Sequence, residues 1–134
     1  MNDIELKTKV HSAMYNLIKA KGMASPVEVL IDIGVLSKED YERWRFGNVP
    51  YLEKVCKINL TKLSKINREI RACAAKSELK PSWTFYRQYG TKEKGKGKSV
   101  KLRFSKNGDE NIEKLYATHY LSKDFTKKPK EENI

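Results

Sequence analysis

The sequence has few of the residues that hold metals or form disulfides. Its 134 residues include two cysteines and two histidines. Cys56 and Cys73 do not form a C-x-x-C pair, and His11 and His119 have no further metal-ligating residue at a suitable spacing, so neither a metal nor a cofactor is predicted. Each cysteine lies among apolar residues of an expected helix, which favours buried thiols in a reducing compartment.

Long apolar runs are also missing. No segment approaches the roughly 20 apolar residues that a membrane-spanning helix needs. Residues 1–10 carry charges throughout and lack the apolar core of a signal peptide. These absences predict that the chain has no membrane partner and lies in the cytoplasm.

Acidic residues are too few to balance the basic ones. The chain has 17 Asp and Glu residues against 28 Lys and Arg residues, which gives a formal net charge of +11. An excess of this size attracts polyanions over a long range. The charge alone would suit nucleic acid, an anionic membrane or an acidic protein. Of these we predict nucleic acid, and a surface that only keeps the chain in solution is the alternative.

The apolar residues that are present suffice for a folded core. Hydrophobic residues make up 39% of the chain and aromatic residues 10%, whereas disordered chains are depleted in both. We predict one helical domain over residues 1–121, with a basic hairpin at about residues 82–105, and a disordered tail over residues 122–134. The expected fold class is mainly α with one β-hairpin, which is an α+β fold.

Apolar residues recur at helical spacing in several segments. Gly22 suits the end of the first helix, because glycine readily adopts the left-handed conformation. Ser25, Ser37 and Asp109 are expected to cap helix starts, and Glu28 completes a capping box with Ser25. The expected helices cover residues 3–21, 26–33, 38–46 and 110–121, and residues 50–79 form either one helix or two.

After Pro81 the pattern becomes alternating, which predicts two half-buried strands joined by an exposed, mobile tip at residues 90–99. One face of the first strand carries Trp83, Phe85 and Tyr89, and the other carries Thr84, Tyr86 and Gln88. In the second strand, Val100, Leu102 and Phe104 alternate with Lys101 and Arg103. We expect Tyr86, Lys101 and Arg103 on the outer face of this hairpin.

The positive charge gathers on two neighbouring segments. Residues 92–103 hold six cations and one acidic residue, a local net charge of +5, and the expected helix from residue 60 carries four more cations. Exposed lysines and arginines contact phosphates and release counterions, and an outward tyrosine stacks on bases. The candidate nucleic-acid-binding residues are Lys62, Lys65, Arg68, Arg71, Tyr86, Lys92, Lys94, Lys96, Lys98, Lys101 and Arg103.

Residues 25–46 resemble a helix–turn–helix, with Gly34 in the turn and Arg43 and Arg45 on the second helix. These two arginines are further candidates for phosphate contacts, and the alternative is that their side chains cover apolar surface beside Trp44. With the basic hairpin as a wing, residues 25–104 resemble the winged helix–turn–helix class by architecture. The chain departs from the usual pattern at Asp40, where an apolar residue is expected. We favour the later basic helix, residues 60–75, as the recognition helix, because it directly precedes the hairpin. The resemblance implies a small bacterial-type protein that binds duplex DNA, as a transcriptional regulator or a mobile-element protein.

Other functions remain open at this point. Tyr41, Trp44 and Tyr51 are favoured as core residues, but an exposed patch of the three would mark an adaptor domain with a protein partner or a second copy of this chain. Binding of RNA or of a single strand is a further alternative. Gly97-Lys98-Ser99 matches the end of a phosphate-binding loop, but the full pattern needs glycine at position 92, where the chain has Lys92. No catalytic constellation is found elsewhere. No enzyme is therefore predicted.

Overall fold

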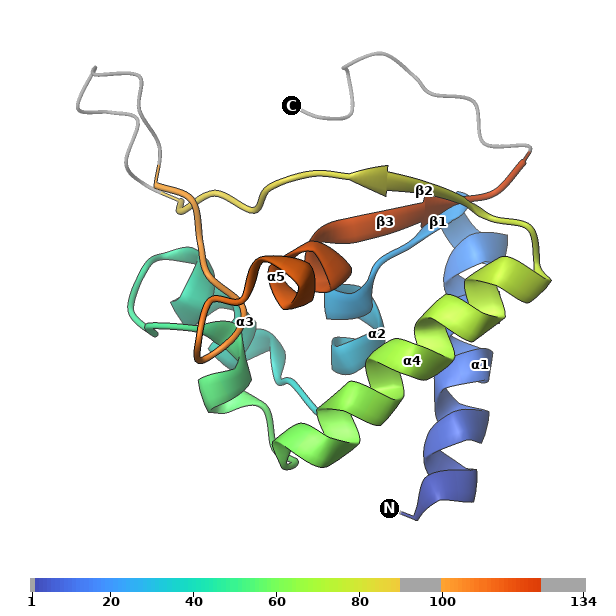
Figure 1. Ribbon diagram of the computed structural model, residues 1–134, viewed down its shortest axis with the longest axis horizontal. Helices are drawn as coiled ribbons and strands as arrows, with labels where there is room; N and C mark the ends of the chain where they lie inside the picture. Colours follow the sequence, from blue (N-terminus) through green and yellow to red (C-terminus); the bar gives the residue numbers. More distant parts are fainter. Residues whose placement is uncertain (1, 90–99, 124–134) are drawn as a thin grey trace.

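The computed structural model describes residues 2–89 and 100–123. Within these residues the chain forms five α-helices, one 3-10 helix and a three-stranded antiparallel sheet (Figure 1), so the predicted α+β class is confirmed. The elements in chain order are α1 (Asp3–Lys21), β1 (Met23–Ala24), α2 (Pro26–Asp32), α3 (Lys38–Arg45), η1 (Leu52–Val55), α4 (Leu60–Lys76), β2 (Lys80–Trp83), α5 (Glu110–Ala117) and β3 (Thr118–Leu121).

The predicted capping residues end and start the helices as expected. Gly22 ends α1 with a left-handed φ of 73°, and the side chains of Ser25, Ser37 and Asp109 accept backbone N–H groups at the starts of α2, α3 and α5. The capping box at α2 forms only in part, because the Glu28 carboxylate accepts from the Ser25 hydroxyl and not from the Ser25 backbone N–H. Residues 50–79 form two helices, because η1 is followed by a new start at Asn59, whose side chain accepts the Lys62 N–H.

The sheet corrects the prediction of a final helix over residues 110–121. α5 ends at Ala117, and Thr118–Leu121 forms β3, the central strand of the order β1-β3-β2. Local sequence did not indicate β3, because Leu115, Tyr116 and His119 keep the spacing of a helix face. β1 and β3 form by pairing with each other, Met23 with Leu121 and Ala24 with Tyr120, across almost the whole described chain.

The predicted hairpin is much shorter than expected. β2 pairs with β3 rather than with the strand predicted at residues 100–104. Between the two predicted hairpin strands there is one bridge, Arg87 with Lys101, flanked by hydrogen bonds from the Leu102 N–H to the Tyr86 carbonyl and from the Gln88 N–H to the Val100 carbonyl. The predicted tip, with Lys92, Lys94, Lys96 and Lys98, lies outside the described residues.

Tyr86 and Trp83 of the first hairpin strand lie on the opposite sides from those predicted. Tyr86 is only 9% exposed and packs against the rings of Trp44 and Phe104, whereas Trp83 is 48% exposed. The prediction that Tyr86 lies on the outer face is therefore wrong. Alternation separates two faces but does not say which of them meets the core. Here the contact between the Tyr86 and Trp44 rings places Tyr86 in the core.

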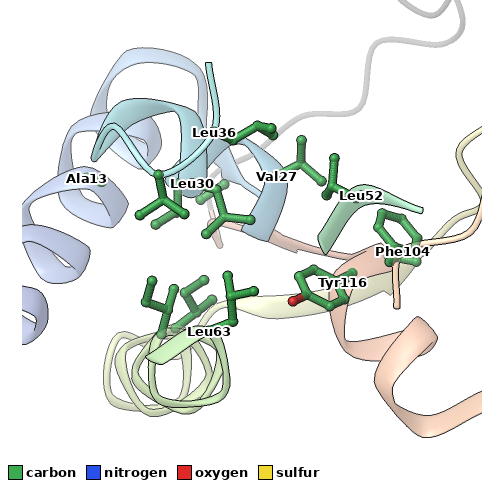
Figure 2. Close-up of a cluster of buried hydrophobic side chains, with 14 of the residues drawn as sticks. Ala13, Val27, Leu30, Leu36, Leu52, Leu63, Phe104 and Tyr116 are labelled. Atoms are coloured by element: carbon green, nitrogen blue, oxygen red, sulfur yellow. The ribbon is translucent and has the colours of Figure 1, made fainter. Parts of the chain in front are cut away.

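Trp44 lies at the centre of the aromatic core and is completely buried, which confirms its placement in the core. Its ring centroid lies 5.6 Å from that of Tyr86 and 5.2 Å from that of Phe104, and Phe104 stacks on Tyr116. The Trp44 indole N–H donates to the carbonyl oxygen of Arg103 at 2.9 Å. Figure 2 shows aliphatic side chains that continue this core, from α1, α2, η1 and α4.

Trp44→Phe is expected to lower the free energy of unfolding by about 2 kcal/mol, because it leaves a cavity and removes one of the two donors to the Arg103 carbonyl oxygen. Urea unfolding followed by far-UV circular dichroism measures the change. Trp83→Phe is the matched control and should cost less than about 0.5 kcal/mol, since Trp83 is half exposed. Equal losses in the two variants would contradict this assignment of the core.

Candidate nucleic-acid interface

The four cations predicted on α4 do not share one face. Lys62 and Lys65 lie on the side of α4 that packs against α1, where their Nζ atoms are 3.6 and 2.8 Å from the Asp3 carboxylate. Lys65, and to a smaller extent Lys62, lowers the pKa of Asp3. Arg68 and Arg71 are exposed. Of the four cations, Lys62 and Lys65 are therefore paired with α1, whereas Arg68 and Arg71 are exposed and, among the described residues, have no ion pair with it.

Arg71 lines a small cavity between α4 and α5, of about 190 Å³, together with Ser64, Lys106 and Asn107. Glu53 is the acidic residue of this cavity and is already engaged. Its carboxylate accepts from the Tyr116 hydroxyl at 2.8 Å and from the Lys106 N–H at 3.2 Å. Arg71 and Lys106 therefore give this groove a positive rim.

Arg103, predicted as a phosphate contact, supports the loop that follows it. Its Nε and Nη2 atoms donate to the carbonyl oxygens of Ser105 and Lys106 at 2.9 and 2.8 Å. The guanidinium also lies 5.5 Å from the centroid of the Tyr51 ring. Two of its donor groups are thus used within the fold.

The alternative arginines of α3 differ in their surroundings. Arg43 donates to Asp40 at 2.9 Å on the surface. Arg45 is half-buried among tyrosines: its Nη1 donates to the Tyr41 hydroxyl, and its guanidinium lies 4.1 Å from the Tyr89 ring centroid and 5.1 Å from that of Tyr86. Arg45 therefore joins α3 to the start of the hairpin, which matches its reading as a side chain that covers apolar surface.

Cations and aromatic rings meet on an outer face formed by β2, the hairpin stem and α5. We call this the Trp83 surface, and it consists of Trp83, Phe85, Arg87, Lys101 and Lys114. The rings of Trp83 and Phe85 lie edge to face at 4.5 Å. The Lys101 Nζ is 4.1 Å and the Arg87 Cζ 5.5 Å from the Phe85 centroid, and the Lys114 Nζ is 5.7 Å from the Trp83 centroid.

A cavity of about 440 Å³ opens beside the Trp83 surface. Leu102 and Phe104 line it on the core side, and Glu110, Asn111 and Glu113 line it on the α5 side. The Glu113 carboxylate accepts from the backbone N–H groups of Phe104 and Ser105, and its Oε2 also accepts from the Ser105 hydroxyl. These bonds hold the negative charge of Glu113 against backbone donors and fix the segment that carries Lys101 to α5.

Sequence reasoning found only Lys101 of this surface. Residues 83, 85 and 87 share one face of an extended segment, so the same alternation that marked Trp83 and Phe85 also places Arg87 beside them. The prediction missed this because it turned that face toward the core. Lys114 comes from another element, and nothing in the local sequence indicates its position near Trp83.

A second cavity, of about 460 Å³, is lined by more acidic than basic side chains. Tyr86, His119, Glu28 and Asp32 are among its lining residues. The Tyr86 hydroxyl and the His119 Nε2 are 3.1 Å apart. Burial lowers the pKa of His119, and burial, with the nearby Glu28 carboxylate, raises that of Asp32.

The cysteines are half-buried rather than fully buried. Burial raises the pKa of both thiols, that of Cys56 to about 12 with the Glu53 and Asp40 carboxylates contributing. Among residues 2–89 and 100–123, no three His, Cys, Asp or Glu side chains are grouped so that they could hold a metal ion. No helix in the described part of the chain is long and apolar enough to span a membrane.

Three comparisons with known proteins add no relative. No family model matches this chain, and neither a curated protein nor a solved structure does.

The stability of the fold is expected to fall as the pH drops below about 6.5, the ordinary pKa of histidine. The pKa of His119 is lowered in the folded chain, so the unfolded chain takes up this proton first and is favoured by acid. Urea unfolding at neutral and mildly acidic pH measures the effect. His119→Gln should show a weaker loss of stability with acid, and an unchanged pH dependence would contradict this role of His119.

Proposed function

We propose that this chain binds nucleic acid and that the Trp83 surface is a main contact. The observation that carries the proposal is the gathering of three cations around two exposed or half-buried aromatic rings on one face. Lysine and arginine at such a face contact phosphates, and the counterions released from the nucleic acid favour binding. The overall charge of +11 attracts the ligand from a distance.

Duplex DNA is the ligand that the resemblance to winged helix–turn–helix proteins implies, and we propose α4 as the recognition helix. The path of the chain supports this proposal, because α4 leads directly into β2 and the hairpin stem (Figure 1). Arg68 and Arg71 are the exposed arginines of α4. In this arrangement α4 contacts the duplex through these two side chains, and Lys101 contacts the backbone from the stem.

Lys101→Gln combined with Lys114→Gln is expected to reduce the salt dependence of binding. Each lysine that contacts a phosphate adds about 1 to the slope of log affinity against log salt, so the double variant should lose about 2. Fluorescence anisotropy with a labelled oligonucleotide over a salt series measures this slope.

Lys7→Gln combined with Lys19→Gln is the matched control, because it removes the same formal charge from exposed positions of α1. The control should keep the slope of the wild-type chain. If it loses as much as the first double variant, binding depends on the net charge alone and not on the Trp83 surface.

Arg68→Gln with Arg71→Gln is expected to weaken duplex binding at least several-fold, since both guanidinium groups are exposed. Lys62→Gln with Lys65→Gln removes the same charge from α4 but from side chains paired with Asp3, and should have a smaller effect. The same anisotropy assay compares the two. A larger loss in the lysine variant would exclude the proposed face of α4.

A further inference from the structure

Trp83 is unusual among the large apolar residues of this chain because it is exposed beside a cavity and under a cation. Its side chain is 48% exposed on β2, an edge strand of the sheet. It contacts Phe85 edge to face, and the Lys114 Nζ lies 5.7 Å from its ring centroid. A large indole in this position leaves apolar surface in water, which folding alone does not favour.

The cavity beside the ring has a volume and a lining that suit a flat, polar heterocycle. Its volume of about 440 Å³ lies within the range of sites that hold small ligands. Leu102 and Phe104 supply an apolar wall, while the Asn111 amide and the Glu110 carboxylate line the opposite, α5 side. An amide and a carboxylate offer hydrogen-bond donors and acceptors of the kind that meet the edge of a nucleobase.

Cations flank this cavity on both sides. Lys101, from the hairpin stem, lies over the Phe85 ring, and Lys114, from α5, lies beside the Trp83 ring. Both line the cavity and both are exposed. A base held between them has its own and the neighbouring phosphates within reach of positive charge, whereas Glu110 at the same rim repels a phosphate and suits the amino group of a base.

We infer that the Trp83 surface binds an unpaired nucleotide of DNA or RNA, with its base against the Trp83 ring and its phosphates at Lys101 and Lys114. A paired base is stacked on both faces inside a duplex and cannot offer one of them to an indole, whereas an unpaired base can. The inference rests on the proposed function and deepens it, because it names the form of nucleic acid that this surface takes.

The test compares a labelled single-stranded oligonucleotide with the duplex of the same sequence, using the full chain at low salt. Anisotropy gives the two affinities, and intrinsic fluorescence reports the contact with Trp83, since Trp44 is completely buried and serves as an internal reference. We expect both probes to bind, and we expect only the single strand to quench the exposed tryptophan, because only an unpaired base can stack on it.

Trp83→Leu keeps an apolar side chain beside the cavity but removes the indole face. It should weaken single-strand binding about tenfold, the usual effect of losing one stacked base, and change duplex binding less than twofold. Tyr15→Leu is the matched control, because Tyr15 is also exposed under a lysine, Lys19, but on α1 and away from this cavity. The control should bind both probes as the wild-type chain does.

The outcomes separate the inference from the function beneath it. If the wild-type chain binds both probes equally and its tryptophan emission does not change, the inference is wrong and nucleic-acid binding stands. If neither probe binds at low salt, the proposed function fails and the inference with it. The quenching measurement needs no variant, so it decides even if Trp83→Leu does not fold.

Discussion

Trp44 holds together the two parts of the chain that form the proposed interface. From its buried position in α3 it donates to the carbonyl oxygen of Arg103, and the Leu52 N–H of η1 donates to the same oxygen. The next residue, Phe104, stacks on Tyr116 of α5 and packs against Trp44. These bonds and ring contacts hold residues 103 and 104 against α3, η1 and α5, and they position Lys101, which lies two residues before Arg103.

The arginines and lysines of this chain have different roles. Arg45 and Arg103 make their contacts within the fold. Arg45 donates to the Tyr41 hydroxyl and lies among tyrosine rings, and Arg103 donates to two backbone carbonyls. The planar guanidinium suits this, since it stacks on rings and donates in several directions. Lys101 and Lys114 stay on the surface beside aromatic rings. A count of positive charges along the sequence therefore overstates what is available to a polyanion.

Much of the helical part could be predicted, because its signals are local. Ser25, Ser37, Asp109 and Gly22 act within a few residues of where they stand, and each ends or starts a helix as expected. β3 could not be predicted, because Thr118–Leu121 becomes a strand only when β1 and β2 lie on either side of it. Of the Trp83 surface, only Lys101 was predicted as a binding residue. Tyr86, which was predicted on the outer face, lies in the core, since alternation alone does not orient a strand.

The sequence by itself determined where most of the helices begin, the α+β class and the excess of positive charge, because capping and periodicity depend on neighbouring residues and net charge depends on composition alone. The tertiary structure decided which of those charges are available. Asp3 neutralises part of the charge of α4 from another helix, and Trp44 draws Tyr86 inward and so turns Trp83 outward. These outcomes depend on contacts between residues far apart in the chain, which no local pattern records.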